Sequence, residues 1–136
     1  MRTEGTFTVE SFTPAELSPA PEVVVTSAPV GVAVMLKQYT GGVSGRSTTI
    51  FTAAYDQARG AGTYVAMESF DGALDGAAGT FNFVHSATTE GGGRTHEHFA
   101  VVPGSGTAEL AGIRGGGGLA VEDDGTHRVW FDYQLG

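Results

Sequence analysis

The sequence predicts an all-β protein, a closed antiparallel barrel of about eight strands with at most short helical turns. Three observations predict this fold class. Apolar residues alternate with polar or small residues at a period of two. The 22 glycines lie between the apolar runs, where tight turns are expected. No long stretch repeats at the 3.6-residue period of an amphipathic helix.

About eight segments carry the alternating pattern. They cover residues 5–12, 29–39, 46–55, 63–70, 79–88, 95–102, 117–121 and 126–135. In the first segment Phe7, Val9 and Ser11 share one face. In the second segment Val30, Val32, Val34 and Leu36 alternate with small or polar neighbours.

Two further segments have other patterns. Residues 13–29 hold four of the five prolines, which predicts a stiff connector that lies over one end of the domain. Residues 107–112 predict one helical turn, with Thr107 as its cap and Glu109 near its positive end.

A weak repeat links two predicted hairpins. An aromatic residue is followed by glycines two and six positions later, first at Tyr39 and again at Phe70. The spacing indicates two turns that use glycine at positive φ, with an aromatic residue at the strand end. Coincidence in a glycine-rich chain is the alternative.

Composition and charge narrow the possible partners. The 136 residues predict one domain, 1–136. A formal net charge of −8 argues against nucleic acid, and the absence of cysteine excludes disulfides and thiolate metal sites. The chain shows no signal segment, and its longest apolar run, VGVAVML, is too short to span a bilayer. We therefore expect a cytoplasmic protein with no membrane contact.

Strand edges favour closure of the sheet. A sheet of about eight strands with few charged residues at its edges is expected to close into a barrel, because closure pairs the backbone groups of the edge strands. The interior of such a barrel has room for its own side chains or one small ligand. Apolar residues left on the outside would permit a homodimer.

Two stretches carry a resemblance to a known family. They are ESFDGALDGAAGTFNFVHSAT, which begins at Glu68, and VVPGSGTAELAGIRGGGG, which begins at Val101. From about Gly5 to Gly136 the chain resembles a bacterial DUF (domain of unknown function) family with an allene oxide cyclase-like barrel, lipocalin-like in shape. The resemblance implies this fold and no established activity. The wider barrel superfamily includes cyclases and isomerases that act on apolar substrates, which is an analogy of fold.

His96 and His98, in RTHEHF, are the first candidate site. Residues at i and i+2 of a strand share a face, so both imidazoles could ligate a metal as in a cupin. A cupin would add a nearby glutamate and a later histidine, and neither is suitably spaced here. Phe99 and Val101 have core character, which turns the two histidines outward. We expect a polar strand face and no metal or other cofactor.

Glu68 and His85 are the stronger candidates for catalysis. If Phe70 pairs with Phe81, the two polar residues lie diagonally on one aromatic face. A carboxylate there would be desolvated, which raises its pKa toward the range of a general acid or base. The alternative is a hydrogen-bonded pair that fixes the register of the barrel.

The same alternation of side chains between the two faces of a strand predicts the apolar wall of the expected cavity. Its predicted ligand-binding residues are Tyr64, Phe70, Phe81, Phe83, Phe99 and Tyr133.

Three functions therefore remain open at the level of sequence. The first is a barrel that binds a small apolar molecule. The second is a cofactor-independent cyclase or isomerase of the same shape, with proton transfer by Glu68 and His85. The third is a structural or assembly barrel filled by its own side chains, without a ligand.

Overall fold

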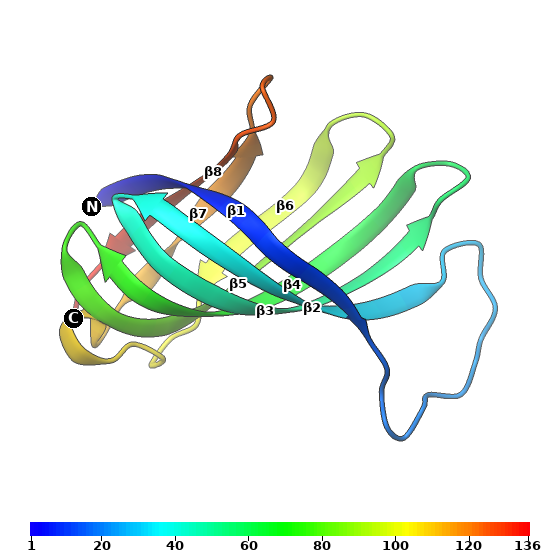
Figure 1. The fold of residues 1–136 in the computed structure, drawn as a ribbon, viewed down its shortest axis with the longest axis horizontal. Helices are drawn as coiled ribbons and strands as arrows, with labels where there is room; N and C mark the ends of the chain where they lie inside the picture. Colours follow the sequence, from blue (N-terminus) through cyan, green and yellow to red (C-terminus); the bar gives the residue numbers. More distant parts are fainter.

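The computed structural model describes residues 1–136 as a closed ring of eight antiparallel strands in chain order (Figure 1). The strands are β1 (Arg2–Ala15), β2 (Val30–Gly41), β3 (Val43–Asp56), β4 (Ala61–Leu74), β5 (Ala77–Glu90), β6 (Arg94–Val101), β7 (Arg114–Val121) and β8 (His127–Gln134). Strand β8 pairs with β1 to close the ring. The predicted all-β class is confirmed. The one helical element is the 3₁₀ turn η1 (Ala108–Leu110), which is too short and too polar to cross a membrane.

The connections alternate between the two ends of the ring. The tight turns after β2 and β4, the segment 102–113 and both chain termini lie at one end, which we call the closed end (Figure 1). The loops 16–29, 57–60, 91–93 and 122–126 lie at the other end, which we call the open end. In Figure 1 the loops of the open end spread apart.

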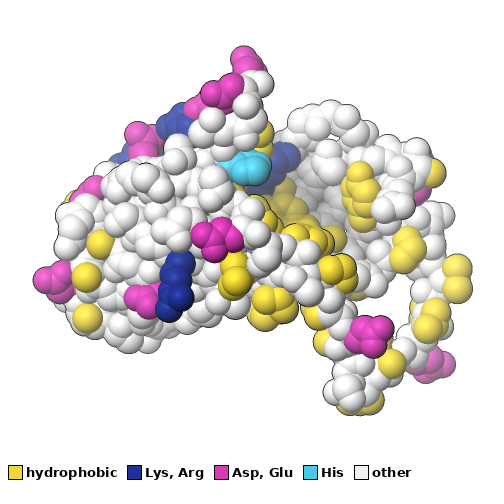
Figure 2. Space-filling view, viewed as in Figure 1, with side chains coloured by type: hydrophobic (Ala, Val, Ile, Leu, Met, Phe, Trp, Pro, Cys, Tyr) yellow, Lys and Arg dark blue, Asp and Glu magenta, His cyan; other side chains and the backbone are white.

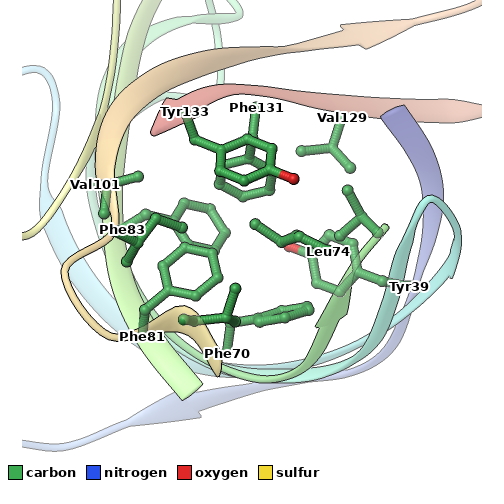
Figure 3. Close-up of a cluster of buried hydrophobic side chains, with 12 residues drawn as sticks. Tyr39, Phe70, Leu74, Phe81, Phe83, Val101, Val129, Phe131 and Tyr133 are labelled. Carbon is green, nitrogen blue, oxygen red and sulfur yellow. The ribbon is translucent and has the colours of Figure 1, made fainter. Parts of the chain in front are cut away.

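A packed aromatic core fills the closed end. Figure 3 shows its side chains pointing toward one another from around the ring. The cluster consists of Tyr39, Val43, Phe70, Leu74, Phe81, Phe83, Val101, Leu110, Ile113, Val129, Phe131 and Tyr133. All twelve are buried, so the interior of the ring at this end is filled by its own side chains.

The segment 102–113 covers the core at the closed end of the ring. It buries Leu110 and Ile113 completely. Thr107 occupies the cap position of η1 but makes no capping hydrogen bond, contrary to the prediction. Its hydroxyl instead accepts a hydrogen bond of 3.0 Å from the backbone N–H of Thr80. A Cβ at Gly79 would lie 2.2 Å from the carbonyl oxygen of Thr107, so the close approach of this segment requires glycine.

Each copy of the repeat lies at a hairpin of the closed end, but the two copies place their turns at different positions of the repeat. Gly41 and Gly76 have φ of 112° and 88°, values that favour glycine at a turn. The two aromatics of the repeat, Tyr39 and Phe70, make an edge-on contact with ring centroids 5.6 Å apart. Each predicted hairpin thus has a glycine at positive φ, but Gly41 is the first glycine of its copy and Gly76 the second. Both aromatics lie in one core, before the strand ends rather than at them as predicted.

Strand β1 differs from its prediction. It runs through Pro14 to Ala15, so the connector begins at residue 16. A bulge between Val9 and Ser11 shifts the alternation. Phe12 rather than Ser11 therefore points to the open end, where its ring meets that of Phe51 at 5.5 Å.

Strand β2 turns its more apolar face outward. Ala33, Lys37 and Tyr39 are buried, whereas Val30 and Leu36 are 73% and 42% exposed. The predicted alternation is present, but the valine face is the one that points away from the core, and Val30 and Val32 at its open end contribute to the lining of the cleft described below. Further apolar side chains on the outer face are Ile50, Val65 and Met67. A homodimer through this face stays a prediction.

Candidate functional site

The open half of the ring contains a cleft of about 890 Å³. Figure 2 shows hydrophobic side chains gathered in a hollow of the surface. The cleft is lined by Phe12, Pro14, Pro29, Val30, Gly31, Val32, Ala33, Phe51, Ala53, Tyr55, Gln57, Gly62, Thr63, Tyr64, Ala87, Thr88, Thr89 and Arg94. Small inward residues, such as Ala53 and Ala87, leave this space open where aromatic rings fill the closed end.

A smaller cavity of about 270 Å³ adjoins the cleft on the inner side. The two share Phe51, Tyr64 and Arg94 in their linings. The smaller cavity also reaches Lys37 and His85. A group bound in the cleft thus lies next to the polar side chains that separate it from the core.

Glu68 forms the centre of these polar side chains. Its side chain is fully buried and its carboxylate accepts four hydrogen bonds. Tyr39 and Ser47 donate to Oε1 at 2.6 and 2.7 Å. Lys37 and His85 donate to Oε2 at 2.7 and 2.5 Å. Strands β2, β3, β4 and β5 each contribute one or more of these groups, so we call the five residues the polar belt.

The polar belt keeps Glu68 ionised. Burial by itself would raise the pKa of this carboxyl, but the hydrogen bond from His85 and the charge of Lys37 outweigh it and lower the pKa to about 2. The pKa of His85 is lowered, first by burial and then by Lys37 and Arg94, against the opposing effect of Glu68. At neutral pH Glu68 is therefore a carboxylate, paired with Lys37 at 2.7 Å, and His85 is a neutral imidazole.

A chain of hydrogen bonds runs from the belt to the cleft. His85 Nδ1 lies 2.8 Å from the hydroxyl of Tyr64, and Arg94 Nη2 donates to the same hydroxyl oxygen at 2.8 Å. A neutral His85 that donates from Nε2 to Glu68 must accept at Nδ1, so the Tyr64 hydroxyl donates to it. The direction of every bond in the chain is thereby set, from Arg94 through Tyr64 and His85 to Glu68.

One hydroxyl of this region is left without a partner. Thr49 is fully buried opposite Glu68 in the β3–β4 ladder, and its Oγ1 makes no hydrogen bond. The carboxylate of Glu68 already has four donors, which explains why Thr49 is not needed to satisfy it.

Comparison with known proteins gives a family and no activity. Residues 3–133 match the family described as "Protein of unknown function (DUF3224)". The chain belongs to this family. A crystal structure of a DUF3224 protein of unknown function from Shewanella oneidensis MR-1 is similar, with 28% identity and a TM-score of 0.83 over 100% of this chain and 98% of the other. No curated protein matches. The likeness to allene oxide cyclase stays a prediction.

The predicted register of this family member is confirmed. Phe70 lies opposite Phe81, Glu68 opposite Phe83, and His85 opposite Ala66. Both polar residues face the interior, and the expected contact between them is present. The expected rise in the pKa of Glu68 is wrong, because Lys37 and His85 stabilise its charge.

The predicted apolar wall divides between the two halves of the ring. Tyr64 lines the cleft. Phe99 packs against the core and lines a separate slit of about 130 Å³ beside β7. Four of the predicted wall residues lie in the packed core and do not line the cleft, namely Phe70, Phe81, Phe83 and Tyr133. Glu68 lines neither the cleft nor the cavity beside it. The prediction failed here because strand parity gives the face of a residue but not its depth along the barrel.

Sequence reasoning missed Lys37, Ser47 and Arg94. Lys37 had a signal, since it shares parity with Ala33 and Tyr39 on the less apolar face of β2. The alternating valines on the other face obscured it. Arg94 begins the RTHEHF stretch and gave no signal of its own.

His96 and His98 are both exposed. The alternation that would place them on one face is broken, because His96 adopts a positive φ of 51° at the irregular pairing of β5 with β6. Nowhere in the structure do three or more His, Asp or Glu side chains come together as a metal-binding group.

Proposed function

We propose that this protein binds a small, mostly apolar molecule in the cleft of the open half. The observation that carries the proposal is that side chains fill the interior of one half of the ring and leave the other half open. The same eight strands enclose a fully packed core at one end and a cleft of about 890 Å³ at the other. Small-molecule sites commonly have volumes of about 300–1,000 Å³, apolar walls and few polar groups.

The chemistry of the lining supports binding of an organic molecule. Phe51 and Tyr64 stack with centroids 5.4 Å apart and an interplanar angle of 15°, which gives a flat apolar surface on the cleft wall. Tyr64 and Arg94, which are hydrogen-bonded to each other, add a polar site beside this surface. The rest of the lining mixes apolar side chains with a few neutral polar ones, among them Thr63, Thr88 and Gln57. A purely structural barrel would account for the packed half alone.

A fluorescent apolar probe tests the proposal. N-phenyl-1-naphthylamine, which is uncharged, should bind with micromolar affinity and increased emission. Ala53→Trp places a large ring in the cleft and should weaken binding at least tenfold. Ile50→Trp is the matched control, since Ile50 is on the same strand but points outward and is 54% exposed. A probe that does not bind, or that binds both variants equally, would contradict a site in the cleft.

The hydrogen-bond chain favours a second function, a cofactor-independent isomerase or cyclase. Glu68 is too deeply buried to touch a substrate, so it orients His85 and Tyr64 meets the substrate. The Tyr64 hydroxyl would pass its proton to Nδ1 of His85, and Glu68 would stabilise the imidazolium that forms. The tyrosinate, held by Arg94, would then take the α-proton of the substrate to give an enolate, and the reverse transfers would return both protons.

Proton exchange in D2O tests this second function. An apolar ketone, 2-tetralone, should lose its α-protons faster in the presence of the protein. Tyr64→Phe should abolish the acceleration. Tyr55→Phe should leave the acceleration unchanged, because Tyr55 also lines the cleft but takes no part in the hydrogen bonds between Arg94, Tyr64 and His85. A lack of any acceleration by the unmodified protein would leave the binding function alone standing.

A further inference from the structure

We infer that the ligand of the cleft carries an anionic group, such as a carboxylate or a sulfonate, which binds to Arg94 beside the hydroxyl of Tyr64. The inference rests on the proposed function, since it names the class of molecule that the cleft would take. The anionic group would be at one end of the ligand, and the rest of the ligand would be apolar, as proposed above.

The lining of the cleft carries a single positive charge. Among the 18 residues that line the cleft, Arg94 alone carries a charge. The whole chain has a formal net charge of −8, yet no acidic residue lines this cleft. A single cation in an apolar cleft attracts an anion more strongly than the same cation on open surface, because the walls exclude water.

Most of the N–H donors of Arg94 are unused. An arginine has five N–H donors. Arg94 uses one of them on the Tyr64 hydroxyl at 2.8 Å. Its Nε lies 3.7 Å from Glu97, which is an ion contact and not a hydrogen bond. The remaining donors have no partner within the chain, and two parallel N–H groups match a carboxylate.

The buried charges behind the cleft balance each other without Arg94. Lys37 and Glu68 are both buried and neutralise each other through a bond of 2.7 Å. Arg94 has no buried acid of its own, because the side chain of Glu97 is 52% exposed and solvent screens it. An anion on a ligand would thus meet an excess positive charge.

The position of Arg94 is also fixed before a ligand arrives. Its guanidinium lies 5.7 Å from the centroid of the Tyr64 ring, and that hydroxyl is in turn held by His85. A group held in place loses less freedom on binding. The apolar body of a ligand can then lie against Phe51 while its anionic end reaches Arg94.

A matched pair of probes tests the inference. 8-Anilinonaphthalene-1-sulfonate and N-phenyl-1-naphthylamine share one ring system and differ by the sulfonate. We expect the sulfonate to bind the unmodified protein at least tenfold more tightly, despite the net charge of −8. The Arg94→Gln variant should bind the two probes with similar affinity, and Arg94→Lys should keep part of the preference.

Arg59→Gln is the matched control for net charge. Arg59 is exposed in the turn at the same end of the ring, so its loss changes the total charge equally and should leave the preference in place. Binding of the neutral probe with no preference for the sulfonate would overturn this inference and not the proposed function. A preference that survives in Arg94→Gln would also overturn it. Failure of both probes to bind would instead overturn the proposed function.

Discussion

The two halves of the ring are built from the same strands and differ in the size of their inward side chains. Strand β5 shows the change along one face, where Phe81 and Phe83 lie in the core, His85 lies in the polar belt and Ala87 lines the cleft. The alternation of the strand continues unchanged throughout. The strands thus pair in the same way whether or not the interior is filled. The change from Phe83 to Ala87, four residues later on the same face of β5, creates the space.

The polar belt lies between these halves and touches both. Its carboxylate packs beside the core, and its histidine makes contact with the tyrosine of the cleft. Burying an ammonium and a carboxylate costs desolvation energy that their attraction offsets only with good geometry. The four short hydrogen bonds to Glu68 provide that geometry. The belt therefore fixes the register of the strands and positions Tyr64 at the same time.

The largest effect should come from removing a ring of the core. Phe83→Ala should lower the free energy of unfolding by about 4 kcal/mol, because the fully buried side chain leaves a dry cavity among four other rings. Phe51→Ala in the open half should cost only about 1 kcal/mol, because its site already adjoins a cleft that solvent enters. Urea denaturation measures both. Equal losses would show that the open half is packed in solution.

The next largest loss of stability should come from removing the charge of Glu68 in the polar belt. Glu68→Gln leaves the Lys37 ammonium buried without a counter-charge and should cost about 3 kcal/mol, or about 10 °C in melting temperature. The double variant Lys37→Met with Glu68→Gln removes both charges and should regain at least half of that loss. A melting curve unchanged by the single substitution would mean that the pair contributes nothing to stability.

The smallest effect is the dependence of stability on pH. The folded pKa of Glu68, about 2, lies below its ordinary value of 4.5. Its stabilising contribution is therefore complete above pH 4.5 and is lost as the pH falls toward 2. The lowered pKa of His85 acts with the same sign below pH 6.5, because the unfolded chain takes up the proton first.

The double variant isolates the share of Glu68 in this dependence. Between pH 7 and 3.5 the unmodified protein should lose about 1–2 kcal/mol more than Lys37→Met with Glu68→Gln, as measured by urea denaturation at each pH. Parallel losses in the two proteins would place the acid sensitivity in other carboxylates.

The fold class and the pairing of β4 with β5 follow from local sequence pattern alone. A period of two selects a strand, and a turn at positive φ sets which residues face each other. For that reason the neighbours of Glu68 and His85 along the hairpin, among them Phe83 and Ala66, were predictable.

Only the tertiary structure decided which residues form the site. The cleft lies at one end because loops far apart in the chain meet there, and local periodicity carries no information about position along the barrel axis. The charge state of Glu68 depends on Lys37, 31 residues away, and access to the belt depends on Tyr64 and Arg94, 30 residues apart. Closing the ring brings these groups within hydrogen-bonding distance, and the low dielectric of its interior makes their interaction strong enough to set the chemistry.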